Sequence, residues 1–154
     1  MTDAELDAKL ADLGLALPQA AAPVASYVPV VEAGGMAFVS GQLPFIDGQL
    51  VTGRLGEDVS EEQGYAAARA CGLMLVAQLK AAGLIGRVAR VVKLGAFVTS
   101  TDSFTMQPKV ANGASDLMVA LFGDMGKHAR SAVGVPALPL GAAVEVDAIV
   151  ALHP

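Results

Sequence analysis

Apolar residues near the start of the chain recur with the spacing of a helix. Over residues 3–13, three leucines recur every three or four positions between charged side chains, which predicts a short amphipathic helix. Residues 17–27 are rich in proline and alanine, and this composition predicts an extended connector.

After the connector the apolar pattern changes to short runs typical of strands. Residues 28–32 and 36–40 are rich in β-branched and aromatic side chains and flank a Gly-Gly pair at 34–35. Two glycines supply the positive φ angles of a two-residue turn, so we expect a β-hairpin here. An Asp-Gly pair at 47–48 predicts a second turn.

The middle of the chain predicts a long helix with a defined start and end. Ser60 and Gln63 have the spacing of a capping box, in which each side chain bonds the backbone of the other residue. The helix should run over residues 61–82 and end at Gly83, because glycine is favoured just after a helix.

A strand and a second helix follow. Residues 87–100 are rich in β-branched residues, and their length fits a central strand. Pro108 is well placed as the first residue of a helix, and either Gly123 or Gly126 should end that helix.

The last two apolar runs predict strands at 130–138 and 143–152, joined by a turn at 139–141 as a closing hairpin. The order after residue 27 is therefore β-β-α-β-α-β-β. Two helices against one face of a mixed sheet of four to six strands make a two-layer α+β domain.

Composition adds an expectation about assembly. The chain has 154 residues, of which 54% are hydrophobic and only 16% charged. An average chain has about a quarter charged residues, so this one has few charges to cover the surface of a monomer. One interpretation is an oligomer, in which part of the surface is interface.

Charge and hydropathy bear on location and partners. No apolar run reaches the length of a membrane-spanning helix, and the acidic start does not resemble a secretory signal, so we expect a cytoplasmic protein. The net charge of −5 disfavours a general nucleic-acid binder. A small basic cluster of Arg87, Arg90 and Lys93 is more typical of a solvated edge than of an RNA platform.

Common catalytic motifs are missing. The chain has no G-x-S-x-G, Walker or H-E-x-x-H sequence, and two histidines with one cysteine hardly make a metal site, so we expect none. Cys71 lies in the middle of the long helix among apolar residues, where a small buried thiol is the ordinary outcome.

Charged residues in the last two strands are the first candidates for chemistry. Strand alternation places Arg130 on one face with Ala132 and Gly134, and it places Glu145 on one face with Asp147. One interpretation is a solvated face or a structural Arg130–Glu145 ion pair. The other is an anion site, in which arginine binds a carboxylate through two hydrogen bonds and the glutamate polarises a water.

Asn112 and Gly113 are unusual inside a predicted helix, because both residue types disfavour helix interiors. In the structural interpretation, Gly113 allows close packing against the sheet and Asn112 faces solvent. In the functional interpretation, Asn112 directs its amide into a pocket.

Polar residues also end the second predicted strand. Ser40 and Gln42 flank Gly41, which suggests a bend at a strand end where ligands often bind. Tyr27 precedes the first strand and either reaches the same region or simply packs.

Two segments carry a resemblance to a known family. Residues 27–44, YVPVVEAGGMAFVSGQLP, resemble the N-terminal motif of the RidA/YjgF family, also called endoribonuclease L-PSP-like. Residues 129–149 resemble its C-terminal signature, which is an Arg-Ser pair, Val-x-Val-x-x-Leu-Pro and a later Glu, here Arg130, Ser131, Val133, Val135, Leu138, Pro139 and Glu145. The resemblance spans roughly 27–152, so we divide the chain into a helix-and-connector segment, 1–26, and a RidA-like domain, 27–154.

The resemblance implies a fold, an assembly and an activity. The family fold is similar to trimeric chorismate mutase, with three sheets packed into a central barrel and ligand clefts between subunits. Family members hydrolyse reactive 2-imino or 2-enamino acids to 2-keto acids and ammonia without a metal or an organic cofactor. The chain is thus expected to be a homotrimer that acts on small-molecule 2-imino and 2-keto acids. We expect no membrane partner, and the acidic charge disfavours nucleic acid as a partner.

Site residues follow from the same resemblance. Arg130 would bind the substrate carboxylate and Glu145 would orient the attacking water, while Tyr27 and Ser40 would line the cleft. Asn112 roughly matches a polar position on the second helix.

The chain also departs from the family pattern. Ala132 stands where the deaminases carry a cysteine in the substrate site, and the usual asparagine of the first family helix has no clear counterpart. Two alternatives therefore stay open, a non-catalytic binder or sensor of small carboxylates and a single-strand endoribonuclease or translation inhibitor. The acidic charge and the missing histidine pair count against the nuclease.

Overall fold

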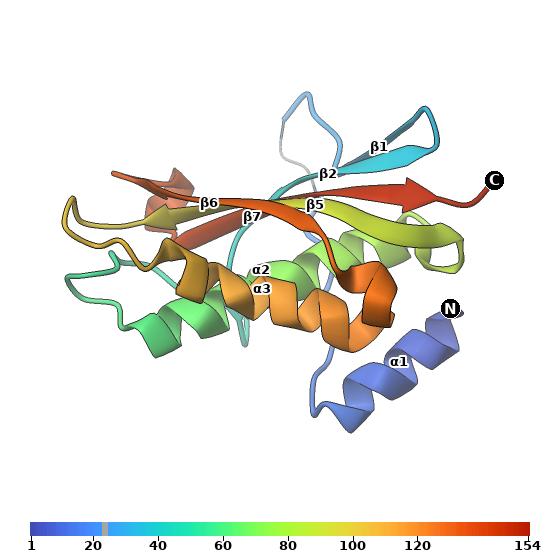
Figure 1. The fold of residues 1–154 in the computed structure, drawn as a ribbon, viewed down its shortest axis with the longest axis horizontal. Helices are drawn as coiled ribbons and strands as arrows, with labels where there is room; N and C mark the ends of the chain where they lie inside the picture. The colour runs from blue at the N-terminus through green and yellow to red at the C-terminus, as the bar shows by residue number, and fades with distance from the viewer. Residues whose placement is uncertain (23–24) are drawn as a thin grey trace.

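Two helices pack against one face of a five-stranded mixed sheet, and a third helix lies beside them (Figure 1). The computed structural model describes residues 1–22 and 25–154, so residues 23–24 of the predicted connector lie outside the described part. The sheet order is β1-β2-β7-β5-β6, and a separate two-stranded hairpin pairs β3 with β4. The elements are α1 (Asp3–Asp12), β1 (Val30–Ala33), β2 (Met36–Gln42), β3 (Phe45–Ile46), β4 (Gln49–Leu50), α2 (Glu61–Ala81), β5 (Val88–Thr99), α3 (Gln107–Phe122), β6 (Ala129–Val135) and β7 (Val144–Leu152), with short 3₁₀ turns η1 (Ile85–Arg87), η2 (Gly123–Gly126) and η3 (Pro139–Gly141).

Local signals in the sequence account for most of the element boundaries. Both arms of the predicted capping box form at the start of α2, where the Ser60 hydroxyl accepts from the Gln63 amide and the Gln63 side chain accepts from the Ser60 amide. The turn between β1 and β2 has Gly34 at φ 57° and Gly35 at φ 74°, as the hairpin requires. Gly123 ends α3 at a positive φ, which is one of the two predicted ends. The two-layer α+β prediction is confirmed, whereas α2 ends one residue early, at Ala81, and α3 begins one residue early, at Gln107.

The predicted closing hairpin is wrong. Strand β6 pairs in parallel with β5 at the sheet edge, while β7 lies between β2 and β5 and is antiparallel to both. The strand predicted over 130–138 also ends early, at Val135, because Pro136 has no N–H to donate to a sheet ladder. The chain therefore crosses the end of the sheet between β6 and β7 instead of turning back beside itself.

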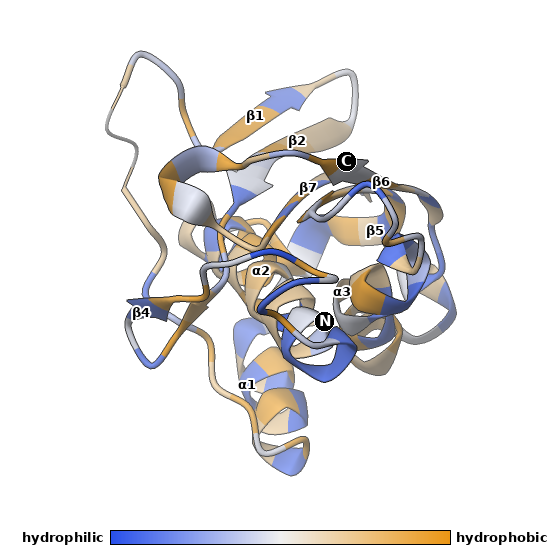
Figure 2. Cartoon of the chain, turned by 90° about the vertical axis from the view of Figure 1, so that its left-hand side faces the viewer, coloured by the Kyte–Doolittle hydropathy of each residue, from blue (hydrophilic) through white to orange (hydrophobic). Residues whose placement is uncertain are grey.

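The core lies between the sheet and the helices α2 and α3. Gly113 is packed where α3 meets α2, since a Cβ there would collide with the carbonyl oxygen of Tyr65. The close approach expected at Gly113 therefore exists, but it is to the neighbouring helix and not to the sheet. Helix α1 alternates hydrophobic and hydrophilic residues (Figure 2) and buries Leu6 and Leu10 in the same core.

The opposite face of the sheet has no helix over it (Figure 1). Three large apolar side chains on this open face, Val31, Phe38 and Val133, are 49%, 43% and 44% exposed. Glu145 and Asp147 of β7 belong to the same face, because the even-numbered residues of this strand are the buried ones. In the described part of the chain, no helix is both long and apolar enough to cross a membrane.

Candidate functional site

Arg130 lies on the edge strand β6 and reaches across to helix α3. Its Nη1 donates to Asn112 Oδ1 at 2.9 Å and to Ser115 Oγ at 3.1 Å. Asn112 is exposed, as in the structural interpretation, and its side-chain oxygen also accepts the hydrogen bond from the guanidinium. Within residues 1–22 and 25–154, Arg130 has no carboxylate partner.

His128 stands behind Ser115 and extends this network. Its Nε2 lies 2.8 Å from Ser115 Oγ, and its Nδ1 lies 2.6 Å from the carbonyl oxygen of Gly126. We name Asn112, Ser115, His128 and Arg130 the cationic group. Sequence reasoning missed Ser115 and His128, although Ser115 is three residues after Asn112 on one helix face and His128 precedes Arg130 by two.

A second polar group forms where β2 and β7 pair. The pairing register shifts between Val39 and Gln42, so one extra β2 residue is accommodated in a bulge at Ser40 and Gly41. The Ser40 amide donates to the Pro29 carbonyl and its hydroxyl to the Val28 carbonyl, both at 2.9 Å. The bend expected from Gly41 is thus present.

Glu145 lies against this bulge. A Cβ at position 41 would collide with the Glu145 carboxylate, so glycine is required for the carboxylate to approach the backbone. Tyr27 and Gly41 line an adjacent cavity of about 110 Å³. We name Tyr27, Ser40, Gly41 and Glu145 the carboxylate group.

The environment of Glu145 favours its protonated form. The side chain is half-buried, and this burial, together with the nearby charge of Asp147, raises the pKa of the Glu145 carboxyl above its ordinary 4.5. Asp147 accepts a hydrogen bond from the Gly95 amide at 3.1 Å, which fixes the neighbouring charge. No hydrogen bond from the described residues stabilises the Glu145 carboxylate. Such a carboxyl is suited to exchanging protons.

The cationic group and the carboxylate group lie on opposite faces of the sheet. Arg130 shares the helix face with Ala132, which is partly buried against the core, whereas Glu145 is on the open face. The two strands are separated by β5, so the Arg130–Glu145 ion pair considered from the sequence does not form within the described chain. The structure thus brings Arg130 to Asn112, and Glu145 to the backbone of Gly41, which follows Ser40 and lines one cavity with Tyr27, but it leaves the two groups apart.

Cys71 is fully buried, as predicted from its place in the long helix. Its Sγ is 3.7 Å from the carbonyl oxygen of Val144, and burial raises the pKa of the thiol well above its ordinary value of 9.0. Across residues 1–22 and 25–154, no three His, Cys, Asp or Glu side chains group closely enough to hold a metal ion.

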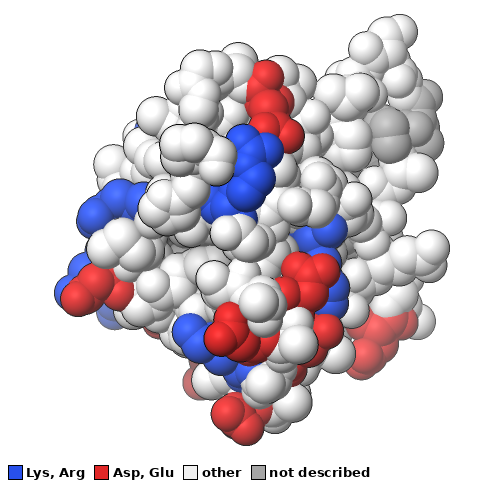
Figure 3. Space-filling model, turned by 90° about the vertical axis from the view of Figure 1, so that its right-hand side faces the viewer, with Lys and Arg blue, Asp and Glu red and all other residues white. Residues whose placement is uncertain are grey.

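The basic cluster is divided among separate partners. Arg87 forms an ion pair with Glu32 at 2.8 Å, and Arg90 donates to the carbonyl of Lys127 at 3.1 Å. On the face of the molecule in Figure 3, basic and acidic side chains are interspersed. This arrangement is that of a solvated edge, as expected from the sequence.

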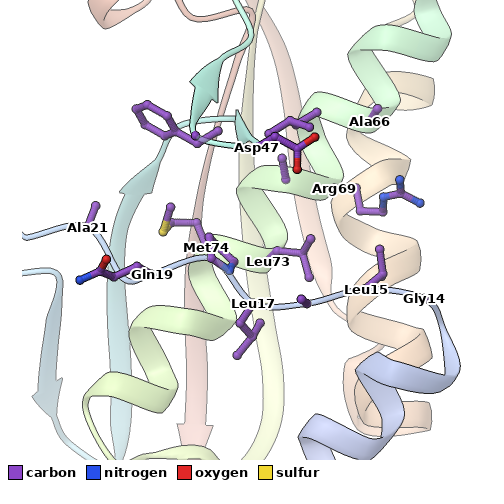
Figure 4. A pocket seen from close by; sticks show the side chains of 16 residues that line it. Gly14, Leu15, Leu17, Gln19, Ala21, Asp47, Ala66, Arg69, Leu73 and Met74 are labelled. Atoms are coloured by element: carbon purple, nitrogen blue, oxygen red, sulfur yellow. The ribbon is translucent and has the colours of Figure 1, made fainter.

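Another cavity, of about 720 Å³, has none of the residues of the two polar groups among its described lining residues. It opens between the segment after α1, the β3–β4 hairpin and α2, and Leu15, Leu17, Leu73 and Met74 are among its lining side chains (Figure 4). Of the residues that the structure describes around it, the charged ones are Asp47 and Arg69. This cavity therefore contains no counterpart of the Arg130 network.

Comparisons with known proteins place these features in a family. The model of the family described as "YjgF/chorismate mutase-like, putative endoribonuclease" matches residues 7–152. Protein TCP17 of Trypanosoma cruzi is 56% identical over 149 residues, which are 95% of this chain and 93% of that protein.

Solved structures agree with this family match. The crystal structure of a protein of unknown function from Agrobacterium tumefaciens is 42% identical, has a TM-score of 0.91 and covers 97% of this chain and 94% of its own. The structure of E. coli TdcF with bound serine is 26% identical, has a TM-score of 0.61 and covers 88% of this chain and 94% of its own.

Proposed function

The chain belongs to the YjgF/chorismate mutase-like family, and from that membership and the two polar groups we propose that it hydrolyses reactive 2-imino or 2-enamino acids to 2-keto acids and ammonia. The observation that carries this proposal is Arg130, a cation held by two neutral acceptors and without a carboxylate partner in the described part of the chain. An arginine arranged in this way is suited to binding the carboxylate of a small substrate.

Arg130 is proposed to bind the substrate carboxylate. Among the described residues, both acceptors of Arg130 bind its Nη1, so the N–H groups on Nε and Nη2 remain for two parallel bonds to a carboxylate. The bound serine of E. coli TdcF, an α-amino acid, is a ligand of the same carboxylate class in a relative. Fixing the anion also places the neighbouring C=N carbon relative to the protein.

Glu145 is proposed to handle the water and the proton. The C=N carbon of a 2-imino acid is already electrophilic, so the reaction needs an oriented water more than a strong base. The water oxygen attacks this carbon while one water proton passes to the Glu145 carboxylate. The same proton then goes to the nitrogen, which gives a carbinolamine with a hydroxyl and an amino group on one carbon. The hydroxyl proton follows to the nitrogen through Glu145, the C=O bond forms as the C–N bond breaks, and ammonia leaves a 2-keto acid. A carboxyl with a raised pKa suits both steps, since it accepts and returns a proton readily.

The complete site is proposed to form between two copies of the chain. Arg130 and Glu145 are on opposite faces of one sheet, so a single chain cannot direct both at one substrate. The open face has exposed apolar side chains that a partner copy would cover, which supports a closed oligomer, and we propose the homotrimer. Tyr27 and Ser40 would then line the cleft on the Glu145 side.

The test measures the rate of imine decay with Arg130 substituted in one variant and Glu145 in another, each variant alone and the two mixed. Imines are generated in situ by an amino-acid oxidase, and their loss is followed by semicarbazone formation. We expect wild-type protein to accelerate decay and expect Arg130→Ala and Glu145→Gln each to be nearly inactive. Refolding the two variants together at equal amounts should restore about one quarter of wild-type activity, because a random mixture makes one site in four from two intact halves.

Each outcome decides between the alternatives. No restoration in mixed oligomers would contradict a site shared between copies. A folded wild-type oligomer that accelerates no imine but binds 2-keto acids saturably would be a small-carboxylate binder. Cleavage of single-stranded RNA that co-elutes with the oligomer and is lost in Arg130→Ala would favour the nuclease named in the family description.

A further inference from the structure

His128 and Ser115 form a hydrogen-bonded chain that ends on the guanidinium of Arg130. We propose that these two residues are positioning residues, which hold Arg130 in the orientation that receives the substrate carboxylate. This inference rests on the proposed function and adds to it the two side chains on which the anion site depends.

The contacts of His128 determine which ring nitrogen carries the proton. Its Nδ1 lies 2.6 Å from the carbonyl oxygen of Gly126, and a carbonyl oxygen only accepts, so Nδ1 must donate. In the neutral ring Nε2 is then an acceptor. Ser115 Oγ, 2.8 Å from Nε2, therefore donates its hydroxyl proton to His128.

The direction of this bond matters to Arg130. Because the Ser115 hydroxyl proton is donated to His128, the lone pairs of Ser115 Oγ are left to accept from Arg130 Nη1, which lies 3.1 Å away. Without His128 the hydroxyl is free to rotate and to donate elsewhere, for example to a backbone carbonyl of α3. The histidine thus orients a serine, and the serine in turn orients the arginine.

The hydrogen-bonded chain from His128 to Arg130 is anchored on a tightly packed part of the backbone, the carbonyl of Gly126. Gly126 is buried, and a Cβ there would collide with the carbonyl oxygen of Met118 in α3, so the backbone at Gly126 is packed tightly against that helix. Its carbonyl therefore gives His128 a fixed acceptor. A network anchored in this way restricts a long and flexible arginine side chain before a substrate arrives.

The acceptors around Arg130 are all neutral, and this has a functional consequence. A carboxylate partner would hold the guanidinium equally well but would neutralise the charge that a substrate anion needs. Asn112 and Ser115 fix Nη1 and leave the positive charge of Arg130 without a counter-ion among the described residues. This combination distinguishes an anion receptor from a structural ion pair.

Two measurements on the full-length protein test the proposal. Long-range proton–nitrogen NMR correlations should show His128 as the Nδ1–H tautomer, and the Nη protons of Arg130 should exchange slowly. Titration with 2-oxobutanoate then compares wild type with His128→Ala, Ser115→Ala and His128→Gln. We expect the Kd to rise about tenfold in both alanine variants and to return to within about threefold in His128→Gln, because a glutamine oxygen can replace Nε2 as the acceptor for Ser115.

Matched controls separate positioning from folding. The other histidine of the chain, His153, lies near the C-terminus, and His153→Gln should bind 2-oxobutanoate like wild type. In imine hydrolysis the alanine variants should raise KM more than they lower kcat, since the reacting groups stay in place. If His128→Ala unfolds, as seen by circular dichroism, Ser115→Ala provides the same comparison.

Three results would overturn the proposal: an Nε2–H tautomer of His128, an unchanged Kd in folded His128→Ala, or equal Arg130 Nη exchange in wild type and Ser115→Ala. The NMR readouts require no substrate. A wild-type protein that neither binds 2-oxobutanoate nor hydrolyses imines would therefore contradict the proposed function, while the tautomer and the exchange rates would still decide whether Ser115 and His128 hold Arg130.

Discussion

The surroundings of Arg130 in the cationic group and of Glu145 in the carboxylate group have opposite effects on the charge at their centre. Arg130 is held by two hydrogen bonds, and His128 extends the network behind one of its acceptors. Glu145 accepts no hydrogen bond from the described residues, and it lies half-buried beside the like charge of Asp147. One charge is held in place by its surroundings, and the other is made less stable by them.

This contrast fits the separate roles proposed for the two groups, anion binding for Arg130 and proton transfer for Glu145. A fixed cation without a counter-ion binds an anion and loses little entropy in doing so. A carboxylate whose ionised form is disfavoured exchanges a proton more easily than an ordinary surface glutamate. In the proposed reaction, substrate binding and proton transfer require different environments, which the two faces of the sheet would supply separately.

Removing the cation should give the largest effect. Arg130→Ala deletes both bonds proposed for the substrate carboxylate, so we expect kcat/KM for imine hydrolysis to fall roughly 1,000-fold. The measurement is semicarbazone-coupled kinetics, with Arg54→Ala as control because the Arg54 side chain forms a 3.8 Å ion pair with Glu57 away from both polar groups. An equal loss of kcat/KM in both variants would show that the activity depends on the overall positive charge of the protein and not on Arg130.

Removing the proton-exchanging group should be the next largest effect. Glu145→Gln keeps the shape of the side chain but cannot accept a proton, so kcat should fall about 100-fold with little change in KM. Because the carboxylate is the active form, the wild-type rate should decrease as pH falls through the pKa of Glu145, with a midpoint above 4.5. A kcat profile in which Glu145→Gln retains this acid limb would assign the limb to another group.

Displacing the carboxylate without removing it should have an intermediate effect. In Gly41→Ala the new methyl group collides with the Glu145 carboxylate and moves it, while the cationic group is untouched. We expect kcat to fall about tenfold and the Kd for 2-oxobutanoate to stay the same. Gly86→Ala is the control, since the nearest atom to a Cβ added at Gly86 would be 3.9 Å away. A higher Kd for 2-oxobutanoate in Gly41→Ala but not in Gly86→Ala would contradict the separate roles of the two groups.

The smallest predicted effect concerns stability. Because burial raises the pKa of Glu145, ionisation destabilises the folded state, a cost that is absent below pH 4.5 and complete above the raised pKa. Glu145→Gln should therefore melt about 1–3 °C higher than wild type near pH 7 and at the same temperature near pH 4. Thermal unfolding followed by circular dichroism checks this, with the exposed Glu57→Gln as control; a pH-independent difference would contradict it.

Local features of the fold were predictable because their causes lie within a few residues. The capping box of Ser60 and Gln63, the turn at Gly34 and Gly35, and the helix end at Gly123 each depend on neighbouring backbone and side-chain groups. The buried state of Cys71 followed equally from its apolar surroundings along one helix.

Strand partners were not predictable in the same way. The two last strands are close in sequence and were assigned to one hairpin, yet β6 pairs with β5 and β7 pairs with β2 and β5. Pairing is decided by contacts between residues far apart in the chain, and the turn signals at 139–141 say nothing about them. The contacts of Ser115 and His128 were missed for the same reason.

The sequence by itself determined that Arg130 shares a strand face with Ala132, and Glu145 with Asp147, because side chains alternate along any strand. Only the tertiary structure decided that these two faces point in opposite directions, because the pairing register places Arg130 beside Leu94 and Glu145 beside Phe97 of β5. It also brought Asn112, Ser115 and His128 to one guanidinium. Alternation is a property of the backbone, whereas the sheet order depends on how the whole core packs.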